Sequence, residues 1–449
     1  MVEVTREGAA GASPCDGAEF SGWDVVALVV GIVVGTGVFK APSLIFAETA
    51  GLSGAVWMWG LGGLLSFCGG LTYAELASSH PANGGDYLYL SHAYGRRWGF
   101  LFGWSQLAVI FSGSIAAMAF AFGDYASRCV STDDRWALGL AFLAIASSSW
   151  VNLWGVALGR RSQNLLTIAK VVGLALVALA GLWISVRNAG TQVVAAEGLD
   201  ASVRAGGNLG LALVFVLYAF GGWNDAVYVA GEVRDVQRTL PRALFGGIAA
   251  VTAIYLAIVC AIWAALGPEL ARTSHAPAAD VVGRAIGPLG SKLVSALIAV
   301  SALGAINGMV ITGARVYGAL GQRHARLAWL RPRDDRGHAP TTAVIAQSLV
   351  AAGYVWLVGT QACRDGLNRA LAVVRLPEIP WDSYFGGFET LVAATAPVVW
   401  FFFCLSGAAS IVIRLRGETT PNSFRMPWFP VPAAAFTAAS AYMLYSSAL

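Results

Sequence analysis

The stretch from Gly31 to Lys40 reads GIVVGTGVFK, and it offers backbone groups rather than reactive side chains for binding. Three glycines fall within seven residues, and a glycine inside a helix costs about 1 kcal/mol relative to alanine. Unwound backbone persists at membrane depth only where protein or a watered cavity satisfies its polar groups. We therefore expect a broken helix whose free amides and carbonyls face a ligand, with the Thr36 hydroxyl beside them.

A second break is expected at Tyr218–Asp225, which reads YAFGGWND. It lies five apolar spans after the first, and an odd interval inverts the orientation of the second break. Two broken helices at corresponding positions of oppositely oriented halves indicate an inverted-repeat transporter with its site near the bilayer midplane. The glycines of the second span, from Gly60 to Gly70, are instead expected to be packing positions, because small residues let membrane helices approach closely.

Two charged residues lie close to these breaks. Lys170 is in the middle of the fifth apolar span, where an ammonium is costly unless it is paired, so we expect it to be functional. Asp225 follows the second break. It could form a structural salt bridge with Lys170 or Arg315, which we rank first, or it could relay a proton or pair with a cationic substrate side chain.

The elements that must position these groups are membrane spans. The chain is 57% hydrophobic and only 12% charged, against about 25% charged in soluble domains. Eleven apolar runs approach the roughly 20 residues needed to cross the hydrocarbon core. They cover about 23–47, 53–79, 98–125, 136–158, 163–186, 207–231, 242–266, 289–320, 341–361, 386–413 and 428–447.

Basic residues favour a cytoplasmic N-terminus. In that orientation 16 Arg or Lys residues fall on the inside and 10 on the outside. The first 22 residues are polar and lack the apolar centre of a cleavable signal. The loop from Ser78 to Arg97 is expected to turn and then run as a short amphipathic stretch along the cytoplasmic surface, with gating as one role.

No catalytic or cofactor pattern accompanies these spans. We find no nucleophile beside a base, no phosphate-binding loop and no zinc spacing among the six cysteines and five histidines. The net charge of +4 gives no argument for a nucleic-acid partner. We expect neither an enzyme nor a cofactor or metal site.

Four motifs in order then resemble the amino acid–polyamine–organocation superfamily, and within it the L-type amino acid transporter group. The resemblance covers about 20–325. It rests on Gly31 to Phe39, on Glu75 to Tyr87, on Gly221-Gly222-Trp223-Asn224 with Glu232 and Arg238-Thr239-Leu240-Pro241, and on Gly304-Ala305-Ile306-Asn307-Gly308 with Arg315.

The resemblance implies an all-α membrane fold with five-plus-five inverted repeats, of the leucine-transporter type, and broken helices 1 and 6. The expected division is a cytoplasmic tail at 1–22, a first repeat at 23–186, a second repeat at 207–413 and an additional helix at 428–447. The family fold has twelve helices and this chain has room for eleven. The last helices lie outside the transport core of that fold, so the missing one bears on oligomerisation rather than on substrate binding.

The resemblance also implies how an amino acid would bind. The amides of Thr36, Gly37 and Val38, with the Thr36 hydroxyl, would hold the carboxylate. The carbonyls of Val33, Tyr218 and Gly221 would hold the ammonium, and the Tyr218 ring would form an outer gate. Asn224 and Asp225 complete the expected substrate-binding set, and Asp225 departs from the family, where a neutral residue is usual.

Further roles follow from the same resemblance. Lys170 matches a lysine that occupies a sodium site of relatives, so it would substitute for sodium. Glu75, Glu232, Asn307 and Arg315 are candidates for gating or structural roles. Cys129 lies in the loop where some members form a disulfide with a heavy-chain glycoprotein, although we favour an unpaired thiol there.

The expected function is secondary transport of amino acids across the cell membrane by alternating access, without sodium, through exchange or proton coupling. Two alternatives stay open. One is an amino acid sensor, or partner-dependent subunit, with a transporter fold. The other is a polyamine or organocation exchanger, which the carboxylate of Asp225 keeps open.

Overall fold

The computed structural model describes residues 20–130, 136–187, 207–332, 340–373, 375, 378–379, 381 and 387–448. Most of the expected tail at 1–22, and about a third of the loop at 362–385, lie outside these residues. Within the described residues the chain is almost entirely helical, and its one isolated β-bridge joins Phe20 to Val233.

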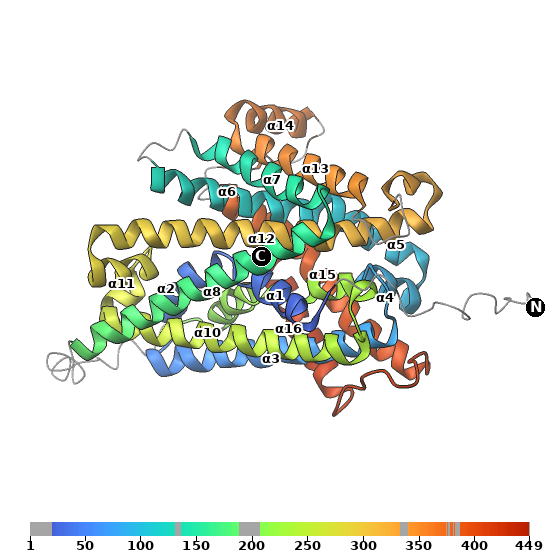
Figure 1. Cartoon of the computed structure of the whole chain (residues 1–449), viewed down its shortest axis with the longest axis horizontal. Coiled ribbons are helices and arrows are strands. Elements are labelled where there is room, and N and C mark those ends of the chain that lie inside the picture. The colour runs from blue at the N-terminus through green and yellow to red at the C-terminus, as the bar shows by residue number, and fades with distance from the viewer. Residues whose placement is uncertain are drawn as a thin grey trace, which may run out of the picture.

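The helices follow the apolar runs of the sequence, and the long ones cross the molecule side by side (Figure 1). In chain order they are α1 (Gly22–Val33), α2 (Gly37–Glu48), α3 (Leu52–Ser79), α4 (Asp86–Tyr94), α5 (Arg96–Ser105), the π-helical turn η1 (Gln106–Ile110), α6 (Phe111–Val130), α7 (Ala137–Leu153), α8 (Val156–Arg187), α9 (Leu209–Ala219), the 3-10 helix η6 (Trp223–Glu232), α10 (Val236–Thr273), α11 (Pro277–Ile286), α12 (Pro288–Arg323), the 3-10 helix η7 (Ala325–Leu330), α13 (Thr341–Gly359), α14 (Gln361–Val373), α15 (Gly387–Leu415) and α16 (Val431–Ala448).

Each of the eleven expected spans coincides with one helix or with consecutive helical segments. Among the described residues, eight helical segments are long and apolar enough to cross a membrane, and the bent pair α1 and α2 makes a ninth. α7 is a shorter apolar helix of 17 residues, and α16 has 18 residues. The prediction of a polytopic helical membrane protein is confirmed.

Glycines allow α3 to pack closely against α10. A Cβ atom on Gly63 would come within 2.7 Å of the Thr252 side chain, and one on Gly70 would come within 2.7 Å of Ile248. Both partners lie on α10. These glycines therefore serve packing, whereas Gly60 of the same span has no neighbour within 4 Å.

The connection after α3 differs from the expected surface stretch. Gly84 and Gly85 adopt positive φ values of 114° and 47°, and the turn sends α4 into the protein. Tyr87, Leu88 and Tyr89 on α4 are consequently buried. The prediction of an amphipathic helix on the cytoplasmic surface was wrong, because the two glycines redirect the chain and the apolar side chains of α4 follow it inward.

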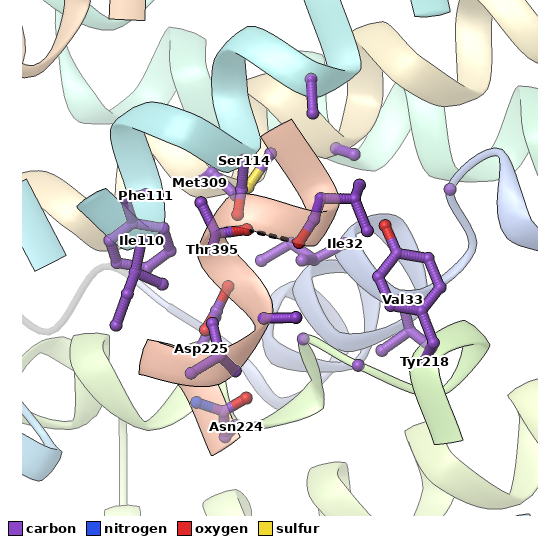
Figure 2. Close-up of a pocket in the computed structure, with 18 of the residues that line it drawn as sticks. Ile32, Val33, Ile110, Phe111, Ser114, Tyr218, Asn224, Asp225, Met309 and Thr395 are labelled. Atoms are coloured by element: carbon purple, nitrogen blue, oxygen red, sulfur yellow. Dashed lines mark hydrogen bonds between the residues drawn. The ribbon is translucent and has the colours of Figure 1, made fainter. Parts of the chain in front are cut away.

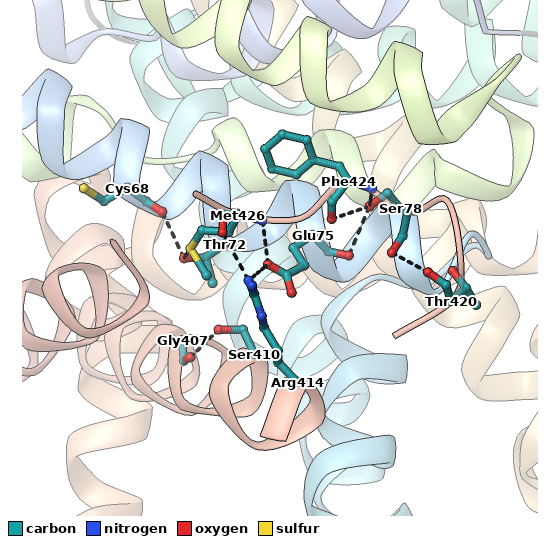
Figure 3. A network of polar contacts seen from close by, with 11 residues as sticks. Cys68, Thr72, Glu75, Ser78, Gly407, Ser410, Arg414, Thr420, Phe424 and Met426 are labelled. Atoms are coloured by element: carbon teal, nitrogen blue, oxygen red, sulfur yellow. Dashed lines mark hydrogen bonds and ion pairs between the residues drawn. The ribbon is translucent and has the colours of Figure 1, made fainter. Parts of the chain in front are cut away.

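The last helix is tied to the core of the fold (Figure 3). Glu75 of α3 accepts hydrogen bonds from Arg414 Nη1 at 2.9 Å and from the Met426 amide at 2.8 Å. This pins the segment that leads into α16 against α3. α16 then brings Phe436 to 5.8 Å from the ring of Trp223, between centroids. α16 therefore touches the second break, although it is expected to lie outside the two repeats.

Candidate functional site

The first break separates α1 from α2, whose axes differ by 53°. The chain leaves the helix at Val34, where ψ is 76°, and the Gly35 amide bonds back to the Val33 carbonyl at 2.8 Å. Within the described residues, the amides of Thr36, Gly37 and Val38 have no acceptor. The Thr36 hydroxyl is likewise buried without a partner there. A helix N-terminus with free amides favours an anion.

The second break joins α9 to η6. Gly222 has a φ of +102°, which favours glycine, and a Cβ atom on it would lie 2.7 Å from the Ile32 side chain. The two breaks are therefore in contact. The Tyr255 hydroxyl on α10 also lies 3.0 Å from the Val33 carbonyl and 2.9 Å from the Ala219 carbonyl. It bridges the last turn of α1 to the last turn of α9.

Lys170 of α8 is fully buried behind the first break. Its Nζ atom donates to the carbonyls of Gly31 at 2.6 Å, Val34 at 2.9 Å and Ser301 at 3.1 Å. An ammonium has three donors, so these carbonyls use its full capacity. The ammonium thus joins the unwound backbone after α1 to α12, which carries Ser301.

The breaks open onto a cavity of about 170 Å³, lined by α1, α2, α9 and η6 together with η1, α6, α12 and α15. Figure 2 shows Asn224 and Asp225 on one side of this cavity and Tyr218 beside Val33 on another. Of the residues predicted to bind substrate, the cavity is lined by Val33, Thr36, Gly37, Tyr218, Gly221, Asn224 and Asp225. Val38 lies in the first turn of α2 and is buried, but it does not line the cavity.

Several lining residues were not foreseen. They include Gln106 in η1, Ser114 in α6, Met309 in α12 and Thr395 in α15. None of these four residues is charged or lies in one of the two breaks, so the sequence gives no sign that they face a cavity. Contacts between separate helices decide their position.

Asp225 is buried in the cavity wall, and its carboxylate has no protein partner within the described residues. The salt bridge to Lys170 or Arg315 that we ranked first is not formed. Lys170 donates all three of its N–H groups to backbone carbonyls. Arg315 pairs with Glu232, at 3.1 Å through Nε and 2.9 Å through Nη2. Glu232, at the end of η6, satisfies the guanidinium of Arg315 in a two-pronged contact.

The backbone acceptors at the breaks differ in what they already hold. The Val33 carbonyl accepts from the Gly35 amide and the Tyr255 hydroxyl, and the Tyr218 carbonyl accepts from the Gly221 amide at 3.1 Å. The Gly221 carbonyl has no donor in the part of the chain that the structure describes. Among the three predicted ammonium ligands, Gly221 therefore has free acceptor capacity.

The gating and structural candidates lie away from the cavity. Glu232 also accepts from Asn83 at 2.8 Å, so it ties η6 to the turn before α4 as well as to Arg315. Asn307 bonds Asn152 at 2.8 Å and Gln163 at 2.9 Å, which joins α12 to α7 and α8. Glu75 belongs to the network with Arg414. These residues hold helices together.

An ion pair between Lys40 and Glu389, 3.2 Å apart and partly exposed, joins α2 to α15. Both residues lie about one helical turn from cavity-lining residues, Gly37 on α2 and Val392 on α15. No local sequence pattern predicts this pair, because its members are 349 positions apart. The Cys129 thiol, by contrast, lies 3.4 Å from the Tyr125 carbonyl of its own helix.

Comparison with known proteins places the chain in a family. The family model described as amino acid permease matches residues 20–449. The serine/threonine exchanger SteT of Bacillus subtilis is 32% identical over 297 residues, which are 66% of this chain and 66% of the exchanger. The b(0,+)-type amino acid transporter 1 of Mus musculus is 31% identical over 410 residues, covering 90% of this chain and 77% of that protein.

Two solved structures share the fold. A crystal structure of MhsT in complex with L-phenylalanine has a TM-score of 0.56 at 15% identity, covering 95% of this chain and 98% of MhsT. A substrate-bound, outward-open Na+-coupled sialic acid symporter has a TM-score of 0.57 at 11% identity, covering 96% of this chain and 90% of the symporter. The fold is therefore the five-plus-five inverted-repeat type, and the chain belongs to the amino acid permease family of the amino acid–polyamine–organocation superfamily.

Proposed function

We propose that this protein is a secondary transporter that moves amino acids across the cell membrane by alternating access, without sodium, through exchange or proton coupling. The observation that carries the proposal is the set of unpaired amides at Thr36, Gly37 and Val38, next to a buried cavity between two broken helices. Relatives whose names state amino acid transport or exchange support the same activity.

The binding mode follows from the polarity of the breaks. The N-terminal end of α2 offers amides and the positive end of a helix dipole to a carboxylate. The Gly221 carbonyl offers an acceptor to the ammonium, with the Val33 and Tyr218 carbonyls beside it. Tyr218 would act as the outer gate that closes over the bound substrate and excludes water. The amides and the carbonyls contact only the carboxylate and the ammonium, so they do not distinguish one substrate side chain from another.

The domain assignment belongs to the same proposal. Residues 23–186 and 207–413 form two inverted repeats, each beginning with its broken helix, and 428–447 adds a helix. The excess of basic residues on one side supports a cytoplasmic N-terminus. We favour a protein that works without a heavy-chain partner, although the name of one relative describes it as a small subunit.

Transport is tested by counterflow in liposomes that contain the purified protein. Vesicles preloaded with unlabelled amino acids should accumulate the labelled amino acid transiently, because an alternating-access carrier exchanges the two pools. The panel should include the twenty amino acids and several polyamines. Binding without flux would favour a sensor, and flux of polyamines alone would favour an organocation exchanger.

Lys170 is proposed to replace a sodium ion, because its ammonium binds carbonyls of both Val34 and Ser301 as a cation in that place would. Uptake should therefore be unchanged when sodium is replaced by choline. Lys170→Ala should reduce uptake at least about tenfold, since it leaves three buried carbonyls without their donor. Lys292→Ala, which removes an exposed lysine, is the control. If uptake by the wild type collapsed when choline replaced sodium, Lys170 would not be taking the place of a sodium ion.

Asp225 is proposed to favour cationic or polar substrates, since its carboxylate faces the cavity without a protein partner. In competition assays arginine should inhibit uptake by the wild type more strongly than leucine does. Asp225→Asn should reduce that preference by about tenfold or more, because a neutral amide loses the charge-assisted contact. If arginine and leucine compete equally in both proteins, the carboxylate does not select the side chain.

A further inference from the structure

A second buried carboxylate lies outside the cavity. Asp86 is the first residue of α4, in the connection between the second and third spans, and only 1% of its surface is exposed. Its Oδ2 atom accepts from the Tyr228 hydroxyl at 2.8 Å, and its Oδ1 atom accepts from the Ser406 hydroxyl at 2.5 Å. No basic side chain pairs with it within the described residues. In its ionised form Asp86 accepts from both hydroxyls and donates to neither.

This carboxylate determines which way the Tyr228 hydroxyl points. A tyrosine hydroxyl has one hydrogen to donate and two lone pairs to accept with. Because the Tyr228 hydroxyl donates its hydrogen to Asp86, its two other partners must be donors. They are Asn224 Nδ2 at 3.1 Å and Gln106 Nε2 at 3.3 Å. The three contacts use the full capacity of the hydroxyl.

The orientation of the two amides follows. With their nitrogens directed at Tyr228, Asn224 and Gln106 keep their side-chain oxygens for other partners. Gln106 Oε1 is buried and has no partner within the described residues. Both side chains line the cavity, as does the carboxylate of Asp225. Because Gln106 Oε1 has almost no accessible surface, the acceptors that this part of the wall can offer to a ligand are the Asn224 oxygen and the Asp225 carboxylate, and neither has a donor within the described residues.

We propose that Asp86 is a positioning residue that sets the hydrogen-bonding polarity of the cavity wall through Tyr228. The wall then selects amino acids whose side chains carry an O–H or N–H donor over apolar isosteres. An apolar side chain would leave the buried acceptors unsatisfied, and sites built for hydrogen bonding discriminate strongly against analogues that lack the group. The inference rests on the proposed amino acid transport and adds its side-chain selectivity.

The test compares threonine with valine, which have nearly the same shape and differ in one donor. The readout is the ratio of kcat/KM for threonine uptake to that for valine uptake in liposomes. The ratio should be at least about tenfold in the wild type and fall toward one in Tyr228→Phe, because the amides are then free to reverse. Tyr94→Phe is the matched control. It removes a hydrogen bond from Tyr94 of α4 to the Leu405 carbonyl of α15 but leaves the contacts of Tyr228 intact. The threonine-to-valine ratio of this variant should therefore stay at the wild-type value.

Asp86→Asn changes the carboxylate that orients the Tyr228 hydroxyl. It provides the test if the Tyr228→Phe protein does not fold. An asparagine has one acceptor oxygen for two hydroxyls, so the Tyr228 hydroxyl is no longer fixed and the ratio should fall. The double variant should match Tyr228→Phe alone, since both changes act through one hydroxyl. A folded Asp86→Asn protein with the wild-type ratio would overturn the inference. Equal uptake of threonine and valine by the wild type would also overturn the inference, but it would leave the proposed amino acid transport intact. The absence of flux for every amino acid would instead overturn the proposed function.

Discussion

The contact of the Lys170 ammonium with three backbone carbonyls is the interaction on which the rest of this structure depends. A helix that unwinds inside an apolar environment leaves carbonyls unpaired, and each such group costs free energy unless something satisfies it. Lys170 binds the carbonyls of Gly31 and Val34 at the end of α1 and that of Ser301 on α12. The same three hydrogen bonds offset the free energy that burying the ammonium costs. The break and the buried charge thus stabilise each other, and neither would persist alone.

Once the first break is held in this way, the amides on its far side become available. Thr36 and Gly37 line a cavity that the second break completes, and Tyr255 fixes the relative position of the two helix ends by reaching carbonyls on both. We propose that the site separates two tasks. Backbone groups at the breaks are suited to the α-amino acid group that all candidates share. Side chains around Asp225 and Gln106 are left to distinguish one amino acid from another.

Much of this arrangement could be predicted from sequence, and the failures have a common physical origin. The breaks were visible because glycines cluster where a helix should continue, and Lys170 was visible because a charge stands within an apolar run. Pairings between distant helices were not visible. The Lys40–Glu389 and Asp86–Ser406 contacts join residues 349 and 320 positions apart, and no local pattern selects one partner over another. The expected partner of Asp225 was wrong for this reason, since Arg315 pairs with Glu232. Ser114 and Thr395 were missed because a regular helix does not reveal which of its faces borders a cavity.

We propose that the two breaks form one site for the α-amino acid group, and the direct test is a structure determined with a transported amino acid bound. We expect the carboxylate within hydrogen-bond distance of the amides of Thr36, Gly37 and Val38, with the ammonium at the Gly221 carbonyl. The side chain should extend toward Asp225 and Gln106. A substrate bound in the opposite orientation, or one bound outside the cavity between the breaks, would show that the breaks do not form this site.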